Sequence, residues 1–312
     1  MYGFMAALLA AAIWLTIATR FGMPVSTTHS IVGGVIGMGL YIQPSSVNWD
    51  KVIEIVLSWI ASPLLGGILA FVSFFVIKRL IFNSEDPFLQ TKKLAPIIAL
   101  PTFFVLGLAF QFKALKGFYS NLDNAGNINK ETWLPAKEGT TFTPFADGAW
   151  IPINSLVVAL AIGMLASLIL WGVLKRYQFK EEGMAGVEHV FIWLQIITAC
   201  YVAFAHGAND VANAIGPMAA IYDIATSTTG TLTDGNVGVP LFLLLIGGIG
   251  ITVGVATWGY KVMDTIGKKI THITPSRGFA AEFGAATTVL IFSMPFLAVP
   301  ISTTHTLVGA VV

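Results

Sequence analysis

The sequence predicts an all-α polytopic membrane protein with an inverted-topology repeat and discontinuous helices, and three observations carry this prediction. First, 55% of its 312 residues are hydrophobic and 11% are charged, whereas soluble globular proteins carry about 25% charged residues. Second, the apolar residues fall in long runs, which is the pattern of membrane spans. Third, one motif occurs twice. The net charge of +1 gives no indication of a nucleic-acid partner, so the expected surroundings are a lipid bilayer.

Eight apolar segments can be marked along the chain, and most approach the ~20 residues that a spanning helix needs. They are Tyr2–Thr19, Pro24–Ile42, Val52–Ile77, Leu94–Phe112, Ile151–Leu174, Val187–Ile221, Val239–Tyr260 and Phe279–Val299. A ninth begins at Pro300. We therefore expect a multi-pass protein of the cell (plasma or inner) membrane. Met1 and Val312 both lie in apolar runs, which suggests a fragment without its first and last spans.

The basic residues predict the orientation of these segments. Three clusters fall on one face if each segment crosses once, and that face should be cytoplasmic. The clusters are Lys78, Arg79, Lys92 and Lys93, then Lys175, Arg176 and Lys180, then Lys261, Lys268, Lys269 and Arg277. The intervening loop Tyr222–Gly238 has no Lys or Arg. The long loop 113–150 is expected on the extracytoplasmic side.

The repeated motif indicates an internal duplication. Residues 22–36 read GMPVSTTHSIVGGVI and residues 298–312 read AVPISTTHTLVGAVV, with P-x-S-T-T-H-x-x-V-G in register. By the crossing count the two copies enter the membrane from opposite sides, which is typical of secondary transporters with a midplane binding site. We expect residues 1–112 to hold the end of a first repeat and the spans after it. Residues 151–312 would then hold the second repeat.

Polar residues inside one apolar segment are candidates for the binding site. Asn209, Asp210 and Asn213 interrupt Val187–Ile221, and a charge in that position costs roughly 2.5–3.5 kcal/mol. The same run holds three helix breakers: Gly207, Gly216 and Pro217. They predict a helix that opens and frees backbone carbonyls for a cation. The alternative is a polar contact between neighbouring helices.

The two S-T-T-H segments supply hydroxyl donors. They are Ser26, Thr27 and Thr28 in the first copy and Ser302, Thr303 and Thr304 in the second. The proline before each can begin a helix, so hydroxyl and free N–H groups would converge on an anion. The alternative is that the hydroxyls bond back to their own helix.

The remaining titratable residues leave more than one interpretation open. His29, His305 and His206 could line the site or simply pack. Glu282 could bind a cation, carry a proton, or lie at the membrane interface near Arg277. No zinc-ligand spacing and no nucleophile elbow are visible, so an enzyme is the weakest class, and saturable, ion-dependent flux would separate a transporter from a channel.

The charge balance favours coupled transport. Apart from Arg20, the spans contain almost no Lys or Arg. An oxyanion held by hydroxyls beside Asp210 would be repelled unless a cation accompanied it. The gradient of that cation could then drive uptake.

Four motifs in order resemble the inorganic phosphate transporter (PiT) family, which includes sodium–phosphate symporters. They are LQIITACYVAFAHGANDVANAIGP at 194–217, the two P-x-S-T-T-H segments, SWIASPLLGGILA at 58–70 and GYKVMDTIGKKITHITPSRGFAAE at 259–282. The resemblance covers nearly the whole chain except residues 113–150. It implies twelve spans in two inverted repeats with phosphate bound between them.

The resemblance also implies site residues and partners. The substrate contacts would be Ser26, Thr27, Thr28, Ser302, Thr303, Thr304 and Asn213, and the cation contacts Asn209, Asp210 and Glu282. No cofactor is implied, sodium or a proton would be co-transported, and a homodimer stays open. Cargo such as a metal–phosphate complex or sulfate is the runner-up. The family carries a Gly-Ala-Asn-Asp-like motif in each half, whereas this chain shows one, so the twin would precede Met1.

Overall fold

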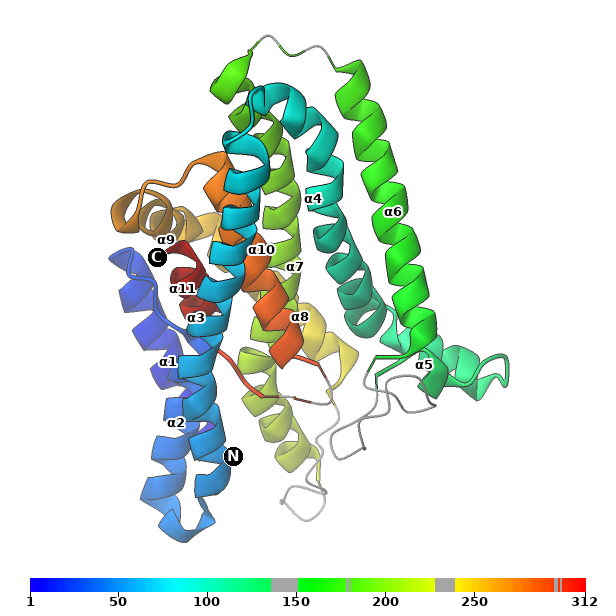
Figure 1. Ribbon diagram of the computed structural model, residues 1–312. Coiled ribbons are helices and arrows are strands. Elements are labelled where there is room, and N and C mark those ends of the chain that lie inside the picture. Colours follow the sequence, from blue (N-terminus) through cyan, green and yellow to red (C-terminus); the bar gives the residue numbers. More distant parts are fainter. Residues whose placement is uncertain (136–150, 178, 180, 228–238, 295–296, 298) are drawn as a thin grey trace. The chain divides into compact units, whose positions relative to one another are not determined.

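The computed structural model describes residues 1–135, 151–177, 179, 181–227, 239–294, 297 and 299–312, and its elements there are all helical (Figure 1). No strand occurs in this part of the chain. The described fold is therefore all-α, as the sequence predicts.

Among the described residues, six helices are long and apolar enough to span a membrane. They are α1 (Tyr2–Arg20), α3 (Trp49–Ile77) with its π-helical continuation Lys78–Phe82, α4 (Pro87–Ala109) with Phe110–Ala114, α6 (Ile153–Arg176), α7 (Gly183–Thr226), and the run Leu241–Ile270 that contains α8 (Leu241–Gly254) and α9 (Tyr260–Asp264). The protein is thus a multi-pass membrane protein.

Two of the eight predicted segments give helices outside that set. The predicted segment Pro24–Ile42 yields α2, Thr27–Ile42, whose 16 residues span only about 24 Å at the helical rise, short of the ~30 Å hydrocarbon core. The segment Phe279–Val299 yields α10, Pro275–Phe292, and residues 295–296 and 298 lie outside the described chain. The last helix, α11, runs from Thr303 to Val311.

Contacts divide the chain into two compact units. The first comprises Met1–Leu64, His206–Ile273 and Pro300–Val312, and the second comprises Leu65–Ala205 and Thr274–Val299. Each unit is assembled from segments far apart in sequence. The division in chain order at residues 112 and 150 stays a prediction.

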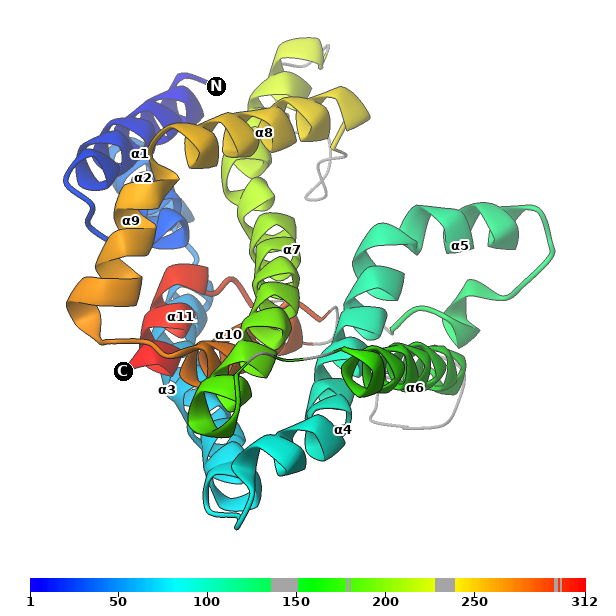
Figure 2. The ribbon, with the colours of Figure 1, turned by 90° about the horizontal axis from the view of Figure 1, so that it is seen from above.

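In the first unit, α1 and α2 run antiparallel and lie side by side (Figures 1 and 2). The absence of a side chain at Gly34 allows this approach, since a Cβ there would lie 3.1 Å from the carbonyl oxygen of Ala7. Beyond the end of α1, Lys261 Nζ lies 3.3 Å from the Arg20 carbonyl oxygen. The structure therefore places Lys261 at the same end of this unit as Arg20.

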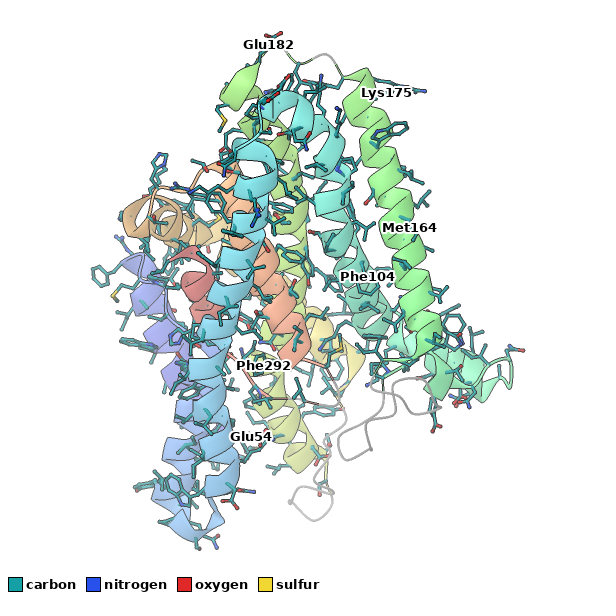
Figure 3. The ribbon with its side chains drawn as sticks, in the orientation of Figure 1. Glu54, Phe104, Met164, Lys175, Glu182 and Phe292 are labelled. Atoms are coloured by element: carbon teal, nitrogen blue, oxygen red, sulfur yellow. The ribbon has the colours of Figure 1, made fainter. Side chains whose placement is uncertain are left out.

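In the second unit, α4 and α6 form an antiparallel pair, with Phe104 and Met164 on the two helices (Figure 3). A Cβ at Gly107 would lie 3.3 Å from Ala159 Cα, and one at Gly163 would lie 3.3 Å from Phe104 N. The pairing brings the start of α4, with its two lysines, to the same end as Lys175 and Arg176 of α6. This placement agrees with the predicted common face of the two basic clusters.

The predicted loop 113–150 begins with ordered helices. The π-helical turn continues α4 to Ala114, and α5 then runs from Lys116 to Asn124. A 3-10 turn follows at Lys130–Thr132. Residues 136–150, like residues 228–238, lie outside the described chain.

Candidate functional site

The two S-T-T-H segments begin helices in the same way. Ser26 Oγ accepts a hydrogen bond from His29 N at 3.1 Å, and Ser302 Oγ accepts one from His305 N at 3.1 Å. Each serine is therefore the N-cap, and a threonine is the first helical residue. The expectation that proline begins these helices was wrong, because the cap is the serine two residues later.

Asp210 of α7 collects hydroxyl groups from both helix starts. Thr27 Oγ1 donates to Asp210 Oδ2 at 2.7 Å, and Thr303 Oγ1 donates to Oδ1 and Oδ2 at 3.1 and 3.2 Å. These threonines occupy equivalent positions in the two copies of the motif. The carboxylate is 8% exposed, and the positive ends of two helices favour its charge.

Two neighbours on α7 complete the shell of this carboxylate. Asn209 Nδ2 donates to Asp210 Oδ1 at 3.1 Å. His206 Nε2 lies 2.9 Å from Asp210 Oδ2 and 3.1 Å from Thr303 Oγ1. The sequence left the role of His206 open, yet its spacing of four residues from Asp210 already placed the two side chains on one helix face.

Asn213 joins α7 to the first motif one turn further along. Its Nδ2 donates to Thr28 Oγ1 at 3.1 Å and to Thr27 Oγ1 at 3.3 Å. Thr28 in turn donates to the carbonyl oxygen of Ile301, just before the second motif, at 2.9 Å. Side chains from one helix and both repeat copies thus form a single polar cluster inside the first unit.

The other predicted hydroxyls have different surroundings. The oxygens of Ser26 and Ser302 accept the capping N–H groups. Thr304 is partly buried near the start of α11, and its counterpart Thr28 is fully buried. The two copies are therefore equivalent at the first threonine and differ at the second.

Helix α7 does not open at Gly207, Gly216 or Pro217, contrary to the expectation from the sequence. It stays helical over all 44 residues, Gly183–Thr226. A proline inside a helix removes one backbone hydrogen bond, and here the helix continues past it. The breaks lie instead before Thr27 and Thr303, so the site is built from side chains of α7 and from two helix starts.

His29 and His305 pack against each other. Their ring centroids lie 4.3 Å apart in an edge-to-face arrangement. His29 also packs against Trp59 of α3, with the two rings tilted by 36° and a centroid distance of 3.7 Å. The packing interpretation that the sequence left open therefore describes this pair.

Glu282 belongs to the second unit. It lies on α10, is partly buried, and accepts a hydrogen bond from Thr198 Oγ1 of α7 at 2.5 Å. The start of α10 is held by Glu188, whose carboxylate accepts from Ser276 N at 2.9 Å and from Ser276 Oγ at 2.8 Å. No pattern in the sequence indicated the Thr198 contact, since the two residues are 84 positions apart.

Comparisons with known proteins agree with this architecture. The profile of the phosphate transporter family matches residues 1–312. A candidate phosphate permease of Pyrococcus abyssi is 45% identical over 312 residues, covering 100% of this chain and 68% of that protein. One of Haemophilus influenzae is 40% identical over 314 residues, covering 99% and 67%. A solved structure, "The sodium-dependent phosphate transporter", superposes with a TM-score of 0.76 at 40% identity, over 99% of this chain and 68% of that one.

Proposed function

The chain belongs to the phosphate transporter family, a family of membrane carriers and not of enzymes, and we propose that it moves inorganic phosphate in symport with sodium. The observation that carries this proposal is the shared carboxylate Asp210. It receives the first threonine hydroxyl of both repeat copies within one buried cluster.

The cluster contains the two kinds of ligand that such a symporter needs. Carboxylate and amide oxygens of Asp210 and Asn209 suit a small hard cation. Hydroxyls at two helix starts, Thr27 and Thr303, suit a phosphate oxygen. The amide of Asn213 lies within hydrogen-bond distance of Thr27 and Thr28 and would orient them. Ser26, Ser302, Thr28 and Thr304 are proposed as further phosphate contacts on the same helix turns.

The geometry supports coupling through charge compensation. The threonine hydroxyls donate to the Asp210 carboxylate in this structure, so a phosphate that recruits them must share them with an anion. A cation on the carboxylate would remove that conflict, because it neutralises the charge that repels phosphate. Sodium fits this role, and the similar solved structure is that of a sodium-dependent phosphate transporter.

Glu282 is proposed as a second cation contact. Its carboxylate accepts the Thr198 hydroxyl inside the second unit, and acidic residues within membrane segments mark ion paths by default. A cation near this pair would find a carboxylate and a hydroxyl oxygen as ligands.

Proton coupling is the second candidate, and His206 is the observation that favours it. Its Nε2 lies 2.9 Å from Asp210 Oδ2, and histidine is the side chain that exchanges protons near neutral pH. A metal–phosphate complex or sulfate as cargo remains the alternative for the hydroxyl donors.

Uptake of labelled phosphate into proteoliposomes tests the proposal. An inward sodium gradient is compared with an equal proton gradient, for the wild type, Asp210→Asn and the matched control Asp50→Asn at the exposed start of α3. We expect sodium-driven uptake that is lost in Asp210→Asn and kept in the control. Uptake under protons alone would favour the second candidate, and uptake of sulfate at the same rate would overturn phosphate selectivity.

A further inference from the structure

We propose that Trp59, together with the His29–His305 pair, is a positioning element that holds the two helix starts so that Thr27 and Thr303 meet at one carboxylate. This inference rests on the proposed function for its meaning in transport. The structural part of the inference is that α3 holds the starts of α2 and α11 in position, and this part can be tested without transport.

The first step is the position of the histidines on each helix start. In α2 and in α11 the threonine at the first helical position contacts Asp210, and the histidine two positions later contacts the other histidine. Residues two apart point to different faces of a helix. Each first turn is therefore fixed on one face by α7 and on another by the histidine contact.

The second step is the contribution of α3. The Trp59 ring lies 3.7 Å from the His29 ring. One residue earlier, Ser58 Oγ donates to the Pro300 carbonyl oxygen at 2.8 Å. One turn after Trp59 on α3, the Pro63 carbonyl oxygen lies so close to α11 that a Cβ at Gly309 would be 2.4 Å from it. Helix α3 thus contacts the first motif through Trp59 and contacts the second motif on both sides of that residue.

The third step is the kind of force in this contact. Within the described chain, neither His29 Nε2 nor Trp59 Nε1 has a hydrogen-bond partner. The contact is therefore one of ring packing, which an aromatic substitute can provide and an aliphatic one cannot. Trp59→Phe should therefore keep the position of the helix starts, and Trp59→Leu should lose it.

The test is disulfide trapping of the two threonine positions. The variant Thr27→Cys/Thr303→Cys is prepared with Cys200→Ser, which removes the chain's one native cysteine. Since both threonine oxygens contact the same carboxylate, we expect the two thiols to form a disulfide under mild oxidation. Adding Trp59→Leu should slow the initial rate of disulfide formation by roughly tenfold. This factor corresponds to about 1.4 kcal/mol in the free energy of bringing the two thiols together. Adding Trp59→Phe should restore the rate.

A matched control is Trp49→Leu, at the exposed start of the same helix, which should leave the rate unchanged. If Trp59→Leu does not fold, His305→Gln removes the other ring contact of His29, the one between the two helix starts, and should also slow trapping. Equal trapping rates with and without Trp59 or the histidine pair would overturn the inference. Because trapping needs no phosphate, its outcome is separate from the uptake experiment.

A kinetic measurement distinguishes positioning from general destabilisation. In the protein with native threonines, Trp59→Leu should raise the phosphate KM by roughly tenfold and leave kcat within about twofold. The reason is that misplaced threonines weaken phosphate binding without changing the later transport step. In a Thr27→Val/Thr303→Val background the same change should add nothing. An additive effect would show that Trp59 does not act through the threonines.

Discussion

The Asp210 carboxylate accepts hydrogen bonds from Thr27 and Thr303, which lie 183 and 93 positions away in the chain. The two copies of the motif therefore contribute the same hydroxyl group to one carboxylate. A carboxylate accepts several donors at once, so both repeat copies can bond to it in one state. The second threonines of the motif, Thr28 and Thr304, have different surroundings in the two copies, and their hydroxyls do not reach this carboxylate.

Because the two threonines make the same contact, we expect their substitutions to weaken uptake to a similar extent. Thr27→Val and Thr303→Val each remove one hydrogen bond to a charged group, worth about 1.5–3 kcal/mol, so the concentrations of sodium and phosphate that half-saturate uptake should rise by roughly 10- to 100-fold. Thr306→Val is the control, because its hydroxyl bonds the Ser302 carbonyl oxygen within its own helix. Uptake titrations measure all three. A normal titration for either threonine variant would contradict the shared role.

Glu282 supports a separate prediction within the second unit. Glu282→Gln keeps the shape of the side chain and an acceptor for Thr198 but removes the charge, so we expect the sodium concentration for half-maximal uptake to rise by roughly tenfold or more. Glu131→Gln, in the exposed turn after α5, is the control. Sodium titrations at fixed phosphate measure the effect, and an unchanged titration would remove Glu282 from the cation path.

At the scale of elements, small residues let helices approach at backbone distance where the functional side chains are placed. Gly309 of α11 lies against Pro63 of α3 in the first unit, and Gly284 of α10 lies against Ala70 and Gly66 of α3 in the second. Gly284 is in the helix that carries Glu282, and Gly309 follows His305 by one turn. Close packing of this kind is how membrane helices associate without a hydrophobic driving force.

These contacts predict which glycines tolerate a methyl group. Gly309→Ala and Gly284→Ala place a Cβ within 2.4 and 2.7 Å of backbone atoms, so each should destabilise the protein by about 1–3 kcal/mol through overpacking. Gly33→Ala is the control, since nothing lies within 4 Å of its Cβ position. The monodisperse fraction after heating in detergent is the measurement. Equal loss in all three variants would disprove the packing explanation.

The sequence was sufficient to predict the elements whose signal is local and insufficient for those that depend on tertiary contact. The repeated motif predicted paired helix starts, although the helices begin after a serine cap and not at the proline. The break expected at Gly207, Gly216 and Pro217 did not occur, because propensity is overridden when neighbouring side chains hold a helix. The residues of the Asp210 cluster were candidates from their motifs, although their hydrogen bonds to one another were not predicted. The contact of His29 with Trp59 could not be predicted, since the two residues share no pattern.

At the scale of the whole molecule, the basic clusters predict which side of the membrane each helix end occupies. Lys92 and Lys93 at the start of α4 and Lys175 and Arg176 at the end of α6 lie at one end of an antiparallel pair. Gln111, near the other end, bonds the Ser155 carbonyl oxygen at the start of α6. An orientation with the basic ends in the cytoplasm places α5 on the outer side.

Accessibility of single cysteines tests this orientation. In a Cys200→Ser background, Asn124→Cys at the exposed end of α5 should react with a membrane-impermeant thiol reagent in intact cells. Lys93→Cys and Arg176→Cys, both at exposed positions, should react only after the membrane is permeabilised, because positively charged ends stay in the cytoplasm. Reaction of position 93 in intact cells would show that the protein has the opposite orientation. It would exchange the sides from which the two S-T-T-H segments are predicted to enter the membrane, while their predicted opposite insertion and their common attachment to Asp210 would stand.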